Sequence, residues 1–596
     1  MRALTAPLYE LSEFEEIRKL LKKPGKYAAL TGCVESQKLH MAYGLSEGLR
    51  CRLIVTFSDQ RMKELQEDYR FYDRNTTCFP ARDVIFYQAD IHGNQLTKER
   101  IRCFRRMMEG RPFTVVTTFG SLLAPQIPLS VFRDNVITVS CNGSLDEKKM
   151  AGELVKLGYE NVYQVEAPGQ FSIRGGIIDI FDLTEENPYR IELWGDDVES
   201  IRSFDVQSQR SIEKLSSITI YPACELILTE EQLKKGMERI EKESRKFSEK
   251  LRKEFKTEEA HRVEEQMNTL KEEVFAYKSL ANLDGYVRYF YEDTVSFLNC
   301  LDVENSIVFL DEPARIREHA SAVELEFRES MSHRLEKGYI LPGQADFLYS
   351  VAEGTARMSA FRLASLAALD LKGGLLKPDW KADISAKSIS SYNNSFEALV
   401  SDLQRYKKNG YRVLLLSGSR TRAKRLAADL SEDGLTSFYT EDPDREIKPG
   451  EIMTFYGRVF RGFEYPLLKF AVISESDIFG AEKKKKKKKK QYEGRKINDF
   501  SELSVGDYVV HENHGLGIYQ GIEKVEVEKV VKDYIKIEYA KGGNLYILAT
   551  QLELIQKYAG SDAKKPKLNR LGSPDWDKTK TRVRGAVKEI AHELVE

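Results

Sequence analysis

Residues 26–125 alternate short apolar runs with longer helical stretches, and this alternation constrains the fold more than any other feature of the chain. The runs KYAALTG, RLIVTFS and FTVVTTF are typical of buried strands, and helices are expected between them near 36–49 and 59–72. Strands that are joined by helices lie parallel in one sheet, with the helices on its faces. The run NSIVFLDEP at 305–313 reads as another buried strand, so we expect this sheet to resume after an inserted segment.

The remaining segments predict further units, in keeping with the roughly four domains that 596 residues can hold. Short strands and turns at about 135–225, such as FSIRGGIIDIF and YRIELW, predict a small α+β module, and a long charged helical stretch follows at 229–275. Residues 391–480 return to the α/β pattern. Beyond them, short β-rich runs punctuated by glycine predict a small barrel. The fold class is therefore a multi-domain chain of α/β and β units.

Charge and composition limit the classes of function. Residues 481–596 carry 25 Lys and Arg against 18 Asp and Glu, which makes this end the more favourable one for an acidic partner. Eight consecutive lysines at 483–490 predict a solvated linker rather than a nucleic-acid patch, because no aromatic residues interleave them. No apolar run approaches the roughly 20 residues that cross a membrane, and the amino terminus lacks the apolar stretch of a signal peptide, so we expect a cytoplasmic protein. The seven cysteines include no CxxC pair, which argues against a zinc ribbon or a disulfide framework.

A glycine follows the first strand, where a nucleotide-binding protein has its phosphate loop. A working loop, GxxxxGK[ST], needs a second glycine for its backbone cradle and a Lys-Ser/Thr pair for phosphate and magnesium. Counted from Gly32, those positions hold Gln37, Lys38 and Leu39, so we expect this loop to be inactive in ATP binding. The run 307–312 has the outline of an acidic magnesium strand, but without phosphates to hold, its two carboxylates are expected to be ordinary strand-end residues.

No other catalytic constellation stands out in the sequence. There is no Ser/His/Asp or Cys/His set with recognisable spacing, and no paired-carboxylate motif. His511 and His514 precede glycines in a turn-like segment without an evident third ligand, so structural histidines are favoured over a metal site. We therefore expect no catalytic residue, no metal and no cofactor in these 596 residues. The alternative is a nucleotide-dependent DNA helicase or repair enzyme whose loop at Gly32 is merely unusual.

The strand Tyr189–Trp194 is more informative, because side chains alternate across a strand. Arg190, Glu192 and Trp194 share one face, and an exposed Arg and Trp together are typical of protein interfaces. A tryptophan that covers a neighbouring strand is an equally good interpretation. Arg174, in the preceding SIRGG run, could join this face.

The run from Ile522 to Lys529 alternates apolar residues with charges inside the expected barrel. Charges on a strand can simply prevent aggregation at the edge of a sheet. The same exposed edge can instead accept a strand from a specific partner. Both interpretations stay open on the residues alone.

Taken together, these segments resemble the bacterial transcription-repair coupling factor family over essentially the whole chain. The resemblance rests on the degenerate phosphate-loop unit, on SIRGGIIDIF, PYRIELW, SFDVQSQRS and SESDIFG, and on GDYVVHENHGLGIYQG, LYILATQLELIQKY and LNRLGSPDW. It implies a degenerate RecA-type unit similar to the repair subunit UvrB, a module that binds the damage-recognition subunit UvrA, and a barrel of SH3 or Tudor type that binds the RNA polymerase β subunit by strand pairing.

The family resemblance also assigns boundaries and site residues. The expected domains are 1–125 and 216–345 for the UvrB-like unit, 126–215 for the inserted module, 346–480 for a third α/β domain, 481–498 for the linker, 499–557 for the barrel and 558–596 for the start of a connecting helix. Arg174, Arg190 and Trp194 are expected to contact UvrA. Ile522, Lys524 and Val525 are expected to contact the polymerase.

The resemblance implies an adaptor that links a stalled RNA polymerase to nucleotide-excision repair. In the family, ATP hydrolysis with magnesium and most double-stranded DNA binding belong to motor domains that follow the connecting helix. We therefore expect the 596 residues to be a fragment or a truncated product that holds the recruitment modules.

Overall fold

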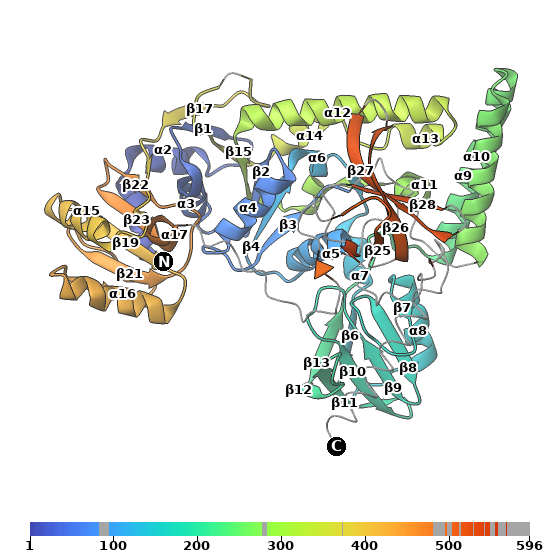
Figure 1. Cartoon of the computed structure of the whole chain (residues 1–596), viewed down its shortest axis with the longest axis horizontal. Helices are drawn as coiled ribbons and strands as arrows, with labels where there is room; N and C mark the ends of the chain where they lie inside the picture. The colour runs from blue at the N-terminus through green and yellow to red at the C-terminus, as the bar shows by residue number, and fades with distance from the viewer. Residues whose placement is uncertain are drawn as a thin grey trace. The chain divides into compact units, whose positions relative to one another are not determined.

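The computed structural model describes most of the chain as two compact units, Met1–Glu482 and Lys483–Glu596 (Figure 1). The described residues are 1–82, 95–276, 283–291, 293–371, 373–480, 495–496, 503–511, 514–527, 530–540, 543–548, 555–557 and 568. The lysine run at 483–490 and the helix expected near 573–596 lie outside them. No helix among the described residues is long and apolar enough to cross a membrane.

The described part of the first unit contains the expected parallel sheet, in the order β17-β1-β16-β15-β2-β4-β3. Its strands are β1 (Tyr27–Thr31), β2 (Cys51–Thr56), β3 (Thr76–Phe79), β4 (Phe113–Thr118), β15 (Ser306–Asp311), β16 (Arg362–Leu366) and β17 (Trp380–Asp383). The covering helices include α2 (Ser12–Leu20), α3 (Glu35–Leu45), α4 (Asp59–Tyr69), α5 (Gln95–Met108), α7 (Leu129–Asp134), α12 (Pro313–Glu336) and α14 (Val351–Met358). Strand β15 pairs with β2, which confirms that the sheet resumes after an insertion.

The sheet also extends past the boundary expected at residue 345, because β16 and β17 both flank β1. Strand β16 reads RLASL, which lacks the Val/Ile-rich pattern of a buried parallel strand. It is nevertheless buried throughout. The guanidinium of Arg362 makes this possible by donating to the backbone carbonyls of Leu21, Lys22 and Glu304 at 2.8 to 3.0 Å.

The inserted module is a second sheet with one covering helix. The strand order is β12-β11-β10-β9-β8-β7, and its pairs are antiparallel except β7 with β8. Its elements are α8 (Glu147–Lys156), β7 (Glu160–Asn161), β8 (Gln170–Arg174), β9 (Ile177–Ile180), β10 (Tyr189–Trp194), β11 (Asp197–Phe204) and β12 (Ser211–Leu215). The pair β6 (Ile137–Ser140) and β13 (Ser217–Ile220) brings the two ends of the insertion together. The module is therefore the small α+β unit that the sequence predicts.

The charged stretch after the module forms two helices rather than one. Helices α9 (Glu230–Lys253) and α10 (Thr257–Lys271) are joined by a tight turn and lie side by side as a hairpin (Figure 1). A third sheet follows in the order β18-β22-β23-β19-β21-β20, with β19, β20, β21 and β23 parallel. Its elements are β18 (Lys387–Ser388), α15 (Phe396–Lys408), β19 (Arg412–Ser417), α16 (Arg420–Glu432), β20 (Ser437–Tyr439), β21 (Ile452–Tyr456), β22 (Phe463–Tyr465), β23 (Phe470–Ser474) and α17 (Glu475–Phe479).

The described residues of the second unit form an antiparallel sheet in the order β24-β29-β25-β26-β27-β28. Its strands are β24 (Arg495–Lys496), β25 (Tyr508–His511), β26 (Gly515–Val527), β27 (Val530–Glu538), β28 (Asn544–Leu548) and β29 (Ile555–Lys557). The buried residues Val509, Tyr519, Ile535 and Ile547 share its core. The structure thus confirms a small β unit, while its closure into a barrel of SH3 or Tudor type stays a prediction.

Candidate protein-interaction sites

The degenerate phosphate loop lies at the carboxyl ends of β1 and β15, where α/β proteins bind nucleotides. The backbone N–H groups of Gly32 and Cys33, which would face a phosphate in a working loop, donate instead to the carbonyls of Ala368 and Ala367 at 3.2 and 3.1 Å. Gly32 has φ +69°, and a Cβ at this position would lie 2.6 Å from the Ile384 carbonyl oxygen. The glycine is therefore needed for close packing of the chain rather than for a phosphate cradle.

The Lys38 ammonium is held by two carboxylates at the carboxyl end of β15, that of its last residue, Asp311, and that of the next residue, Glu312. Its Nζ lies 2.8 Å from Asp311 Oδ1 and 2.6 Å from Glu312 Oε1. Asp311 also accepts from Thr56 Oγ1 at 3.0 Å and from Arg61 Nε at 3.1 Å. Burial alone would raise the pKa of Asp311, but Lys38 and Arg61 hold it below its usual range. The sequence suggested these residues separately, and the structure joins them in one buried ion-pair cluster.

Gln37 is turned away from any nucleotide position. It is fully buried, and its Nε2 donates to the Tyr465 hydroxyl on β22 at 3.0 Å. His40, one helical turn further on, lies 3.0 Å from the same hydroxyl and 2.8 Å from the Leu4 carbonyl. Burial lowers the pKa of His40 to about 4, so the imidazole is neutral at physiological pH. The loop helix α3 thus serves as the packing surface for the third sheet.

A buried carboxylate organises the arginine surface of the inserted module. Asp179 on β9 is almost fully buried and accepts from Arg190 Nε at 2.7 Å and Nη2 at 2.8 Å, which is a two-pronged contact. Arg174 Nη2 donates to the same carboxylate at 3.0 Å. Gln209 Oε1 accepts from the same Nη2 of Arg190 at 3.0 Å. Two guanidinium groups therefore share one negative charge, which leaves this surface positive.

Aromatic rings border the two arginines. Trp194 is 80% exposed and Tyr163 is 84% exposed. The Arg174 guanidinium lies 5.5 Å from the Tyr163 ring centre, and that of Arg190 lies 4.4 Å from the ring of Phe204. The exposure of Trp194 favours the interface interpretation over a tryptophan that covers a neighbouring strand. We call Tyr163, Arg174, Arg190 and Trp194 the arginine–tryptophan surface.

The strand β26 offers a free edge in the second unit. Strand β25 pairs with Gly515–Ile518 only, whereas β27 pairs with β26 as far as Val527. A bulge at Tyr519/Gly521, where Gly521 has φ +109°, separates the two parts of β26. Ile522 is 42% exposed, and the backbones of Lys524 and Val525 pair with β27 on one side. Within the described residues, the other edge of this part of β26 has no strand beside it.

His511 and His514 lie close together in the second unit. The rings of His511 and His514 lie 4.8 Å apart, and burial, with a smaller effect of His514, lowers the pKa of His511 to about 4. In the part of the chain that the structure describes, no group of three or more His, Cys, Asp or Glu side chains could hold a metal ion.

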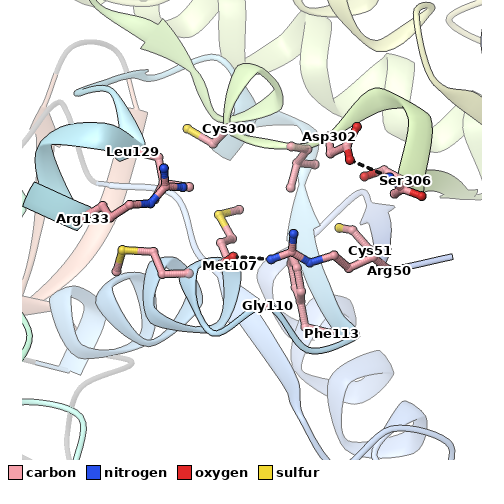
Figure 2. Close-up of a pocket in the computed structure, with 13 residues that line it drawn as sticks. Arg50, Cys51, Met107, Gly110, Phe113, Leu129, Arg133, Cys300, Asp302 and Ser306 are labelled. Carbon is pink, nitrogen blue, oxygen red and sulfur yellow. Dashed lines mark hydrogen bonds between the residues drawn. The ribbon is translucent and has the colours of Figure 1, made fainter. Parts of the chain in front are cut away.

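A cavity of about 420 Å³ lies at the amino ends of β2, β4 and β15, lined by Cys51, Phe113 and Ser306 among others. Figure 2 shows that Arg50 and Arg133 border it from different elements, with Arg50 Nη2 donating to the Met107 carbonyl at 2.9 Å. Nucleotides bind at the opposite ends of parallel strands. The cavity therefore does not lie where parallel α/β sheets usually bind nucleotides.

Two family models match the chain at the segments that carry these surfaces. The UvrB interaction domain matches residues 137–226, and the CarD-like/TRCF RID domain matches residues 503–559. Similar proteins include the transcription-repair-coupling factor of Bacillus subtilis (strain 168), 33% identical over 527 residues that cover 88% of this chain and 44% of the relative. That of Staphylococcus aureus (strain MRSA252) is 28% identical over 601 residues, covering all of this chain and 50% of the relative.

The chain is therefore similar to the transcription-repair-coupling factors along most or all of its length. It spans about half the length of these coupling-factor relatives. Sequence reasoning proposed Arg174, Arg190 and Trp194 for this surface and did not include Asp179 and Tyr163. A lone aspartate inside the apolar strand IIDI was the signal for Asp179, because a buried charge needs a partner.

Proposed function

We propose that the chain is an adaptor with two separate binding surfaces, which binds UvrA through its first unit and the RNA polymerase β subunit through its second. The observation that carries this proposal is the coincidence of each matched segment with one exposed surface. Residues 137–226 contain the whole arginine–tryptophan surface, and residues 503–559 contain the free edge of β26. The adaptor would in this way couple a stalled polymerase to nucleotide-excision repair.

The UvrA contact is supported by how the arginine–tryptophan surface is held. Asp179 fixes both guanidinium groups before binding, which reduces the conformational entropy that the interface must lose. Exposed Trp and Arg side chains are the residue types that dominate binding energy at protein interfaces. The excess positive charge on the surface favours a partner with carboxylates at the matching positions.

The polymerase contact is supported by the backbone of β26. A strand with one open edge can extend its sheet by pairing with a strand of another protein. Ile522, Lys524 and Val525 lie in the part of β26 that has this open edge. We propose that the unit closes into a barrel of SH3 or Tudor type and that this strand is its polymerase-binding edge.

The phosphate-loop cluster is proposed to be structural. Lys38 is neutralised by Asp311 and Glu312, and the amides of Gly32 and Cys33 are occupied by backbone carbonyls. We therefore expect ATP and magnesium to act in other parts of the full-length family, together with most double-stranded DNA binding and the translocase activity. The adaptor is expected to work in the cytoplasm.

Binding measurements with the two purified partners test the adaptor proposal. Immobilised UvrA and immobilised polymerase β subunit should each retain the chain. Arg190→Ala should weaken only the first complex, and Val525→Arg should weaken only the second. Equal loss of both complexes in either variant would contradict two separate binding surfaces, and binding of neither partner by the unaltered chain would overturn the proposed function.

A further inference from the structure

The turn between α9 and α10 holds a phenylalanine that is unfavourable in two respects, its backbone conformation and its exposure to solvent. Phe255 has φ +61°, the left-handed region that bulky side chains rarely adopt, and it is 93% exposed. Its N–H donates to the Arg252 carbonyl at 3.1 Å, and the next N–H, of Lys256, donates to the Leu251 carbonyl at 2.9 Å. These two bonds close the helix end in the pattern known as the Schellman motif, in which glycine is the preferred residue at this position.

Among the described residues, four other helices end in the same motif. In each, the corresponding residue has a positive φ and the same two backbone bonds, and in each it is a glycine; these residues are Gly158 after α8, Gly338 after α12, Gly410 after α15 and Gly434 after α16. The residue that follows is apolar in all four, namely Tyr159, Tyr339, Tyr411 and Leu435. The α9 turn reverses this pattern with an exposed phenylalanine followed by a lysine. Packing of the Phe255 side chain does not compensate for its strained backbone or its exposed ring. These two features therefore indicate a role in binding another molecule rather than in stabilising the fold.

The hairpin holds Phe255 on a rigid support. Helix α9 has 24 residues and is therefore about 36 Å long. Its segment 236–243 is fixed to the body of the unit: a Cβ on Gly236 would lie 2.0 Å from the Phe290 ring, Arg239 Nη1 donates to the Tyr289 carbonyl at 3.1 Å, and Glu243 accepts from the Gly343 N–H at 2.7 Å. The tip is thus presented at a fixed place (Figure 1).

Charges of both signs surround the tip. Arg252 pairs with Glu264 at 2.8 Å, and Lys256 pairs with Glu254 at 3.3 Å. A phosphate backbone selects surfaces with a clear excess of positive charge, which this balanced ring does not provide. A central aromatic side chain inside a polar rim is instead the arrangement of a protein-binding hot spot.

We propose that Phe255 is an anchor that inserts into an apolar socket on UvrA. This inference rests on the proposed function and adds a second contact to it. The hairpin belongs to the same compact unit as the arginine–tryptophan surface, and α9 begins at Glu230, directly after the segment matched to the UvrB interaction domain ends at residue 226. Two contacts held at a fixed spacing bind one large partner more tightly than either contact alone.

Titration of purified UvrA with the full chain tests this anchor. Phe255→Gly removes the ring and relieves the backbone, so it should raise the melting temperature while weakening UvrA binding at least tenfold. Leu325→Ala, which removes another exposed apolar side chain in the same unit, is the matched control and should leave the affinity unchanged. Arg190→Ala reports separately on the proposed function.

Unchanged UvrA affinity of a folded Phe255→Gly protein overturns the anchor, whatever Arg190→Ala does. A loss confined to polymerase binding, to duplex DNA binding or to self-association of the chain overturns it as well, because each assigns Phe255 to a different partner. If Arg190→Ala lowers the affinity for UvrA and Phe255→Gly does not, the proposed function is supported and the anchor is overturned. Absence of UvrA binding by the unaltered chain removes both.

Discussion

Replacing Lys38 by methionine distinguishes a structural lysine from a nucleotide-binding one. In a working phosphate loop this change removes nucleotide binding and leaves the fold nearly intact. Here Lys38 neutralises Asp311 and Glu312 in a buried cluster, so methionine leaves carboxylates without their main counter-charge. Removing one partner of a buried ion pair destabilises a protein by about 3–5 kcal/mol. Because Arg61 and Thr56 still bind Asp311, we expect the lower end of that range, about 3 kcal/mol.

The pH dependence of this loss follows from the direction of two pKa shifts. The pKa of Asp311 lies below its unfolded value of about 3.9, so its stabilising contribution is present above that value and is lost as the pH falls through its folded pKa. Although burial alone would lower the pKa of Lys38, the carboxylates hold it above its unfolded value of about 10.4, so its contribution is lost only as the pH rises through the folded pKa. The loss caused by Lys38→Met should therefore be full between about pH 5 and pH 9 and shrink in acid, where Asp311 binds a proton.

Urea unfolding followed by circular dichroism measures this effect. Lys38→Arg is the matched control that keeps the charge, and the double variant Lys38→Met with Asp311→Asn should lose less than the sum of the two single changes. The reasoning is refuted if Lys38→Met unfolds at the same urea concentration as the unaltered chain. It is equally refuted if ATP stabilises the unaltered chain and this stabilisation disappears in the variant.

The remaining predictions concern the surfaces. Arg190→Ala and Trp194→Ala should each weaken UvrA binding by about 1–3 kcal/mol in calorimetry with an unchanged circular dichroism spectrum; Arg190→Ala should also lower the free energy of unfolding, because it removes the two-pronged partner of the buried Asp179 carboxylate, and unfolding of Trp194→Ala would instead make Trp194 a core residue. Val525→Arg should abolish binding to the polymerase β subunit in a pull-down while UvrA binding persists, and undiminished polymerase binding would remove β26 from the interface. Phe255→Gly should raise the free energy of unfolding by about 1 kcal/mol and Gly434→Phe, at an open position with φ +80°, should lower it by about as much; opposite signs would contradict the strain assigned to Phe255.

The parallel sheet could be predicted because its strands bury both faces and therefore read as continuous apolar runs. Strand β16 escaped this rule because Arg362 is buried by donating to backbone carbonyls, which no local pattern reveals. The break at Phe255 was also missed, because the turn contains no glycine to end a helix. The first case depends on partners that are distant in the sequence, whereas the second depends on a residue type that is rare at such a helix end.

For the candidate sites too, features that follow from a local pattern could be predicted from the sequence, whereas features that depend on distant residues could not. The alternation of side chains on β10 is a local pattern, and it predicts that Arg190 and Trp194 share one face. The role of Lys38 could not be found from the loop motif, because its carboxylate partners follow it by more than 270 positions in the chain. Asp179 needed the structure for a similar reason: it takes the pairing of three strands to bring Arg174 and Arg190 to one carboxylate.

A bridging measurement tests the adaptor account most directly. Polymerase β subunit is immobilised, the 596-residue chain is added, and purified UvrA follows. The account predicts that UvrA is retained only when the chain is present, that Arg190→Ala loses UvrA but stays on the polymerase, and that Val525→Arg loses both from the surface while still binding UvrA in solution. Mutually exclusive binding of UvrA and polymerase to the unaltered chain would contradict it.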